Sequence, residues 1–184
     1  MRTYAIFIPH TLVFCLIAVS LSTAAGDAAA QNCLTDGTGT FRAKLYGALV
    51  SELNWGNEGT ACTGFTSSSG PVRLQFSRRT DDGELVVDLT IRGVAEGETG
   101  RAFKGGVSLS GSALEGQRFQ TPAEACTFTI VENTLITATL LERIYKLVGS
   151  ARCRAPAVTE PPGSEIRIAE LSFKGQTRWS KSTR

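Results

Sequence analysis

The chain has 184 residues, of which 42% are hydrophobic, and its formal net charge at pH 7 is +2. This composition excludes collagen-like, coiled-coil and largely disordered chains. The small net charge excludes neither a nucleic acid nor a membrane surface as a partner, and it favours neither. The only histidine, His10, lies in a segment that we expect to be removed. The mature chain therefore lacks the residue needed for a Ser-His-Asp triad, a Cys-His dyad or a histidine-ligated metal site.

Residues 1–30 have the pattern of a signal peptide. Arg2 is followed by an apolar stretch over residues 5–21 and then by Ala28-Ala29-Ala30, which fits the small-residue rule for cleavage. A cut after Ala25 is an alternative, as is an uncleaved anchor, but no Lys or Arg follows the apolar stretch until Arg42. We therefore expect an extracytoplasmic protein, periplasmic or secreted, whose mature chain is not stably inserted in a membrane.

Four cysteines remain in the mature chain: Cys33, Cys62, Cys126 and Cys153. An even number of cysteines in an exported chain favours disulfides, and four cysteines allow three pairings. A four-thiolate zinc site is the alternative, but the spacing contains no C-x₂-C knuckle. We expect two disulfides, no metal and no cofactor.

The phase of the surrounding strands selects one of the three pairings. Cys126 and Cys153 each lie at a position in phase with the apolar residues of their own strand, so each is expected on the apolar face. If they lie opposite each other, the antiparallel register brings large side chains against small ones: Phe128 against Ala151, and Ile130 against Gly149. This predicts the disulfide Cys126–Cys153. It leaves Cys33 for Cys62, which would tie the mature N-terminus to a glycine-rich loop.

Alternation of apolar and polar residues, the signature of strands, recurs along the chain. It is clearest over residues 41–55, 72–77, 85–92 and 166–173, and weaker over 103–109 and 117–120. Asp81-Asp82-Gly83 predicts a hairpin between two of these segments. A change of parity after Ile168 indicates a bulge near Ala169 and Glu170. We predict an all-β fold, an antiparallel β-sandwich or barrel of about seven to eight strands.

The pattern indicates one β-rich domain over residues 31–175, followed by a basic, frayed tail over residues 176–184. Two segments also offer helical spacing. Over residues 41–53 we favour a strand, because the alternation continues through Gly47. Near residues 134–144 we expect a loop or one short helix, followed by a strand from about Tyr145.

Basic residues occur at the polar positions of several expected strands: Arg42, Lys44, Arg73, Arg92, Arg152 and Arg167. If these strands are neighbours, the residues form a cationic strip able to bind surface carbohydrate or another polyanion, including nucleic acid. An ordinary solvated face is the alternative. Trp55 is a candidate platform for stacking a sugar, although a strand-end tryptophan more often covers the core.

Acidic residues gather at two places without a recognisable catalytic spacing. Asp81, Asp82 and Glu84 fit an ordinary turn better than a calcium loop. Glu96 and Glu98 lie in a glycine-rich stretch, residues 93–106, that we interpret as a surface connection or a loop contacting a ligand. We therefore expect a non-enzymatic binding or structural module of unknown role. The alternative is a carboxylate-based hydrolase acting on extracytoplasmic glycans.

Overall fold

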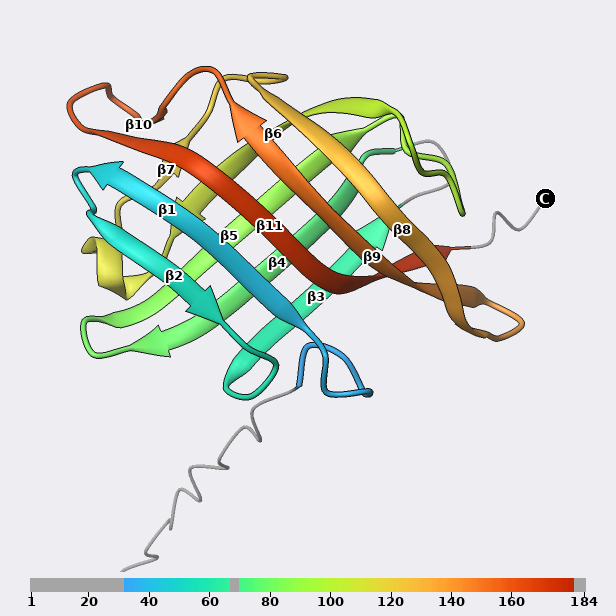
Figure 1. Cartoon of the computed structure of the whole chain (residues 1–184). Coiled ribbons are helices and arrows are strands. Elements are labelled where there is room, and N and C mark those ends of the chain that lie inside the picture. The colour runs from blue at the N-terminus through green and yellow to red at the C-terminus, as the bar shows by residue number, and fades with distance from the viewer. Residues whose placement is uncertain (1–31, 67–69, 181–184) are drawn as a thin grey trace, which may run out of the picture.

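The computed structural model describes residues 32–66 and 70–180, so the expected signal peptide lies outside the described residues. These residues form eleven strands and one short 3₁₀ helix, η1 (Figure 1). In chain order the elements are β1 Thr40–Gly47, β2 Ser51–Trp55, β3 Thr60–Thr66, β4 Val72–Thr80, β5 Gly83–Arg92, β6 Ala102–Ser110, η1 Ser112–Leu114, β7 Phe119–Gln120, β8 Cys126–Ala138, β9 Glu142–Cys153, β10 Ala157–Thr159 and β11 Glu165–Ser180.

The strands form one sheet that closes on itself. Its continuous path runs β3–β4–β5–β6–β8–β9–β11, and β11 returns to β3 through a short parallel pairing. All the other pairings are antiparallel, which confirms the predicted fold class. Figure 1 shows the result as two layers, with β1, β2, β8, β9 and β11 in front of β3, β4, β5 and β6. The structure has more strands than predicted because short strands such as β7 and β10 carry too few residues to show alternation.

A chain of aromatic rings joins the two layers. The ring of Phe76 on β4 lies 4.9 Å from that of Phe41 on β1 and 6.4 Å from that of Phe173 on β11. Trp55 continues this chain, 5.3 Å from Phe41, and is only 4% exposed. Trp55 is therefore a core residue, and its candidacy as a sugar-stacking platform on the surface is wrong.

The first predicted strand region is confirmed as strand but consists of two strands. β1 and β2 form a hairpin in which Phe41 pairs with Trp55 and Ala43 with Leu53, so both strands bury the same parity. Gly47 ends β1 with a φ of 107°, a conformation that side-chain-bearing residues rarely adopt. In both strands the odd-numbered residues are the buried ones. The alternation therefore continues unchanged through the turn, and the hairpin looks like one long strand in the sequence.

Two predicted segments differ from the structure. Residues 134–144 contain no helix; they form the end of β8, a turn and the start of β9. β-Branched residues such as Thr134, Ile136 and Thr137 favour this extended pairing. Residues 176–180 are not a frayed tail, because β11 pairs with β9 as far as Ser180 and Trp179 is buried.

Both predicted disulfides are present, Cys33–Cys62 and Cys126–Cys153. The register of β8 and β9 is also as predicted, with Phe128 opposite Ala151 and Ile130 opposite Gly149. Cys62, however, lies in strand β3 rather than in a loop. The predicted bulge is confirmed: Leu45 pairs with Ile168 and Lys44 with Glu170, which leaves Ala169 without a partner on β1.

Gly149 leaves space that the core needs, which gives a stability prediction. A Cβ at Gly149 would lie 2.8 Å from the Phe173 ring and 2.7 Å from the Thr129 carbonyl oxygen. We expect Gly149→Ala to lower the free energy of unfolding by about 1–3 kcal/mol, because backbone and ring must move apart. Chemical denaturation measures this loss. In the control Gly56→Ala the added Cβ has no neighbour within 4 Å, and an equal loss there would refute the argument.

The disulfides should strengthen a core that does not depend on them. They join residues 29 and 27 positions apart, so each is expected to contribute roughly 3–4 kcal/mol through loop entropy. Reduction should lower the melting temperature while the far-ultraviolet circular dichroism keeps its β signature at room temperature. Complete unfolding of the reduced protein at room temperature would show that the core alone is insufficient.

Candidate binding groove

The structure separates the predicted cationic strip into two groups. Arg42, Lys44 and Arg167 lie on β1 and β11 in the front layer. Two of the three are matched by carboxylates: Lys44 lies 3.7 Å from Glu170, and Arg167 lies 3.2 Å from Glu165. Arg42 donates to the Asn54 side chain. This part of the surface is electrostatically balanced and does not form the expected strip.

The remaining predicted cations lie along the continuous part of the sheet from β4 to β9. Arg92 on β5 pairs with Lys104 on β6, Lys104 with Thr127 on β8, and Thr127 with Arg152 on β9. The Lys104 Nζ donates to the Thr127 hydroxyl at 3.1 Å, which fixes the middle of this row. Arg73 lies on β4, the strand next to β5. The predicted residues Arg73, Arg92 and Arg152 therefore belong to one region.

A groove of about 480 Å³ is hollowed into this region, on the outer face of β3–β6. We call it the outer groove. Its floor includes a row of polar side chains that are direct partners across five strands: Thr63, Gln75, Asp88, Ser108 and Gln120. A second row places Phe65 beside Arg73 and Thr90, followed by Gly106. Because successive residues of a strand face opposite sides, this polar set lies directly above the core.

The wall of the outer groove is the segment after β7. Thr121 holds this segment to β6: its amide donates to the Val107 carbonyl at 2.9 Å, and its hydroxyl accepts from the Val107 amide at 3.0 Å. A Cβ at Gly106 would lie 3.1 Å from the Thr121 hydroxyl, a tight contact that a larger residue could make only if Thr121 moved by a few tenths of an ångström. Glu124 follows in a turn with a φ of 63° and faces Arg92 across the groove, at 3.9 Å.

Three arginines and two carboxylates line the outer groove: Arg73, Arg92, Arg118, Asp88 and Glu124. Asp88 accepts hydrogen bonds from Gln75 Nε2 at 2.9 Å and from the Ser108 hydroxyl at 3.4 Å. The Arg73 guanidinium lies 5.7 Å from the centre of the Phe65 ring, which is 56% exposed. Among the described residues, Arg73, Arg118 and the adjacent Lys104 and Arg152 form no ion pair. The described lining of the groove therefore carries one more positive than negative charge, and Arg73 and Arg118 have no carboxylate partner within 4 Å in the described part of the chain.

The sequence interpretation missed Phe65 and Arg118. Phe65 lies at an outward position of β3, a strand whose glycine and threonines made it look like a loop. Arg118 precedes a two-residue strand, too short for a pattern. An exposed aromatic residue three positions after a disulfide cysteine was the only available signal for this part of the groove.

The glycine-rich connection between β5 and β6 is an ordered loop away from the groove lining. Arg101 pairs with Glu98 and donates to the Gly93 carbonyl, while the Ala95 amide donates to Glu98 Oε2 at 2.8 Å. Arg101, and then the Ala95 amide, hold the pKa of Glu98 below its usual value of 4.5. Asn133 on β8 donates to the Ala95 and Glu98 carbonyls. This loop is thereby attached to the base of the β8–β9 hairpin.

Comparison with known proteins adds no relative: no family model, no curated protein and no solved structure matches the chain. Within residues 32–66 and 70–180, no group of three or more His, Cys, Asp or Glu side chains is placed to hold a metal ion. Over the same residues, no helix is long and apolar enough to cross a membrane. The two disulfides are typical of an oxidising compartment.

The lowered pKa of Glu98 predicts an acid transition in its loop. The ionised Glu98 stabilises the loop above its ordinary pKa, and this contribution is lost as pH falls through the lower folded pKa. We expect the Ala95 amide chemical shift in NMR spectra to titrate with a midpoint below 4.5. Glu98→Ala should abolish that transition and Glu58→Ala should leave it intact. A midpoint at or above the ordinary value would contradict this assignment.

Proposed function

We propose that the protein is an exported, non-enzymatic binding module whose outer groove binds an anionic carbohydrate. The alanine-rich cleavage motif and the two disulfides support an extracytoplasmic location, periplasmic or secreted. The observation that carries the proposal is the coincidence in one groove of unpaired arginines, an exposed aromatic ring and a row of amide and hydroxyl groups.

Each of these groups suits one part of an acidic sugar. Guanidinium groups bind carboxylates in a two-pronged geometry, as Arg73 and Arg118 can do here. Amides and hydroxyls such as Gln75, Gln120 and Thr90 match sugar hydroxyls, which both donate and accept hydrogen bonds. The Phe65 ring offers an apolar surface for a sugar face. A single-stranded nucleic acid is a poorer fit, because it prefers successive aromatic platforms and Phe65 is the only aromatic residue among the described residues that line the groove.

Direct binding of oligosaccharides to the oxidised protein tests the proposal. We expect a uronic-acid oligosaccharide to bind more tightly than a neutral oligosaccharide of equal length, with an affinity that falls as salt increases. Arg73→Gln and Arg118→Gln should each weaken binding roughly tenfold, because each removes a charge-assisted hydrogen bond. Arg42→Gln is the matched control: it removes an unpaired arginine from the other layer and should change nothing. Isothermal titration calorimetry measures all five affinities.

Three results would refute the proposal. One is equal affinity for the neutral and the acidic oligosaccharide. Another is tighter binding to a DNA oligonucleotide of similar length. The third is a loss on Arg42→Gln as large as that on Arg73→Gln, because the binding surface would then not be the groove.

A hydrolase acting on glycans remains the second candidate, favoured by one observation. Asp88 on β5 and Glu124 on the wall line the same groove, and a glycosidase needs two carboxyl groups facing a shared cleft. Both carboxylates already have polar partners within the groove, which fits a role in shaping the binding surface. Incubating the bound oligosaccharide and measuring its length separates the candidates. Shortening that Asp88→Asn and Glu124→Gln both abolish would replace the binding module with the enzyme.

A further inference from the structure

The turn of the β8–β9 hairpin, residues 139–141, lies beyond Glu142, the last residue of β9 that β11 pairs with (Figure 1). Leu140 is 91% exposed and Leu141 is 75% exposed, and both lie in the turn between the two strands. Leu135 and Ile136 at the end of β8 are about half exposed. No charged residue occurs from 133 to 141. We call Leu135, Ile136, Leu140 and Leu141 the hairpin tip.

Folding does not require leucines at this turn. Hairpin turns favour Gly, Asn, Asp and Ser, and the β4–β5 turn of this chain has Asp81 and Asp82. The turn at the tip is instead held by Thr139, whose amide donates to the Glu142 carbonyl at 2.8 Å. The Thr139 hydroxyl also accepts from the amides of Leu141, at 3.3 Å, and Glu142, at 3.1 Å. The backbone thus presents the two leucines to the solvent in a defined conformation.

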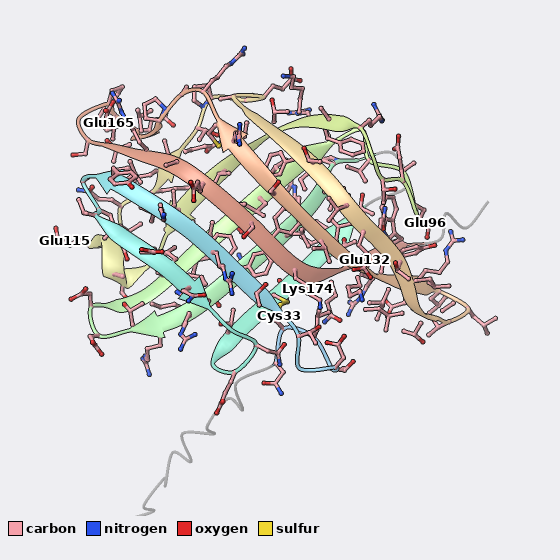
Figure 2. All side chains as sticks on the ribbon, viewed as in Figure 1. Cys33, Glu96, Glu115, Glu132, Glu165 and Lys174 are labelled. Carbon is pink, nitrogen blue, oxygen red and sulfur yellow. A yellow bond between two sulfur atoms is a disulfide. The ribbon has the colours of Figure 1, made fainter. Side chains whose placement is uncertain are left out.

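Ion pairs surround the base of the hairpin tip. Glu142 lies 2.9 Å from Arg178, Arg143 lies 2.7 Å from Glu96, and Lys146 pairs with Glu132. Figure 2 labels Glu96 and Glu132, the acidic members of two of these pairs. Because these charges are matched in pairs, the region contributes little net charge of its own. It places a polar collar around an apolar end.

Two basic residues follow directly in the sequence. Ser180, the last residue of β11, is the partner of Glu142, so β11 ends beside the tip. The chain continues after Ser180 with Lys181, Ser182, Thr183 and Arg184, which contains two basic residues and no acidic one. The chain therefore has an apolar tip and a polar collar, and two basic residues follow in the sequence after the strand end that lies beside them.

We propose that the hairpin tip inserts into the interface of an anionic lipid bilayer and holds the protein peripherally at a membrane surface. Apolar residues that enter the boundary between headgroups and acyl chains, with basic residues beside them, are the combination that binds anionic lipid. The ion pairs of Glu142 and Arg143 would then lie at headgroup level.

The shape of the tip favours lipid over a protein partner or a second copy of this chain. A stable protein interface buries roughly 800 Å² on each side. Two leucines in a turn, with two half-exposed neighbours, form the narrow end of a hairpin rather than a face of that size. A bilayer requires no complementary surface, so a narrow apolar tip can be buried in it completely.

Vesicle flotation of the oxidised protein tests this proposal. The protein should float with phosphatidylcholine vesicles that contain phosphatidylglycerol and much less with phosphatidylcholine alone. Leu140→Ser combined with Leu141→Ser should weaken binding roughly 100-fold, since two leucines lose their burial. Lys181→Gln and Arg184→Gln should each weaken it about fivefold. Val50→Ser is the matched control: Val50 is also 75% exposed, lies in another turn, and its loss should leave binding unchanged.

A second measurement follows the tip directly and does not depend on the stability of the two serine substitutions. The fluorescence of a Leu140→Trp variant should shift to shorter wavelength when anionic vesicles are added, because the indole leaves water. Arg73→Gln with Arg118→Gln, in the outer groove, should change neither flotation nor this shift, so the two proposals fail separately.

The proposal is wrong if the protein does not float with either vesicle, or if Val50→Ser reduces flotation as much as the leucine variant does. It is also wrong if sedimentation shows a dimer that the Leu140 and Leu141 substitutions dissociate. The tip would then pack against a second copy of the chain instead of lipid.

Discussion

The pairing of β11 with its neighbours is the constraint on which the rest of the structure depends. This strand of sixteen residues pairs with β9 from Leu171 to Ser180, with β1 from Ile166 to Lys174, with β10 at its start and with β3 near its end. The register of β11 decides which set of alternate residues in each neighbouring strand faces the core. Phe173 therefore points inward beside Phe76 and Phe128, where it touches both layers of the sandwich. A slip of one residue would expose that entire row.

The local part of this arrangement could be predicted from the sequence. Alternation marks β4, β5 and the β1–β2 pair because each has one apolar face and one polar face. The disulfide Cys126–Cys153 could be predicted with its register, because placing Phe128 against Ala151 satisfies volume as well as phase. The bulge at Ala169 was visible for the same reason: a parity change inside an otherwise regular strand requires an unpaired residue.

What escaped prediction depends on contacts between distant residues. β3 looked like a loop because Gly64 interrupts it, but a Cβ there would lie 2.3 Å from the Gln176 carbonyl oxygen on β11. That glycine is required by a strand more than a hundred residues away, which no local pattern records. The predicted cationic strip failed in part for the same reason. Strands that share polar parity need not be neighbours, and Arg42 and Arg73 lie in different layers.

Side-chain volume and strand phase determine the residues of the core. The candidate sites are recognised because they contain residues that these two constraints do not require. Inside the sandwich, nearly every side chain is explained by volume and phase. In the outer groove and at the hairpin tip, residue types occur that the fold does not need: arginines without carboxylate partners at Arg73 and Arg118, and leucines in a solvent-exposed turn at Leu140 and Leu141. Exposed leucines in a turn reduce solubility, and exposed arginines without carboxylate partners leave positive charge available to a ligand, so both features fit a partner outside the chain. The groove and the tip share no residue, and a protein held at a membrane by its hairpin would keep the outer face of β3–β6 accessible to an acidic glycan.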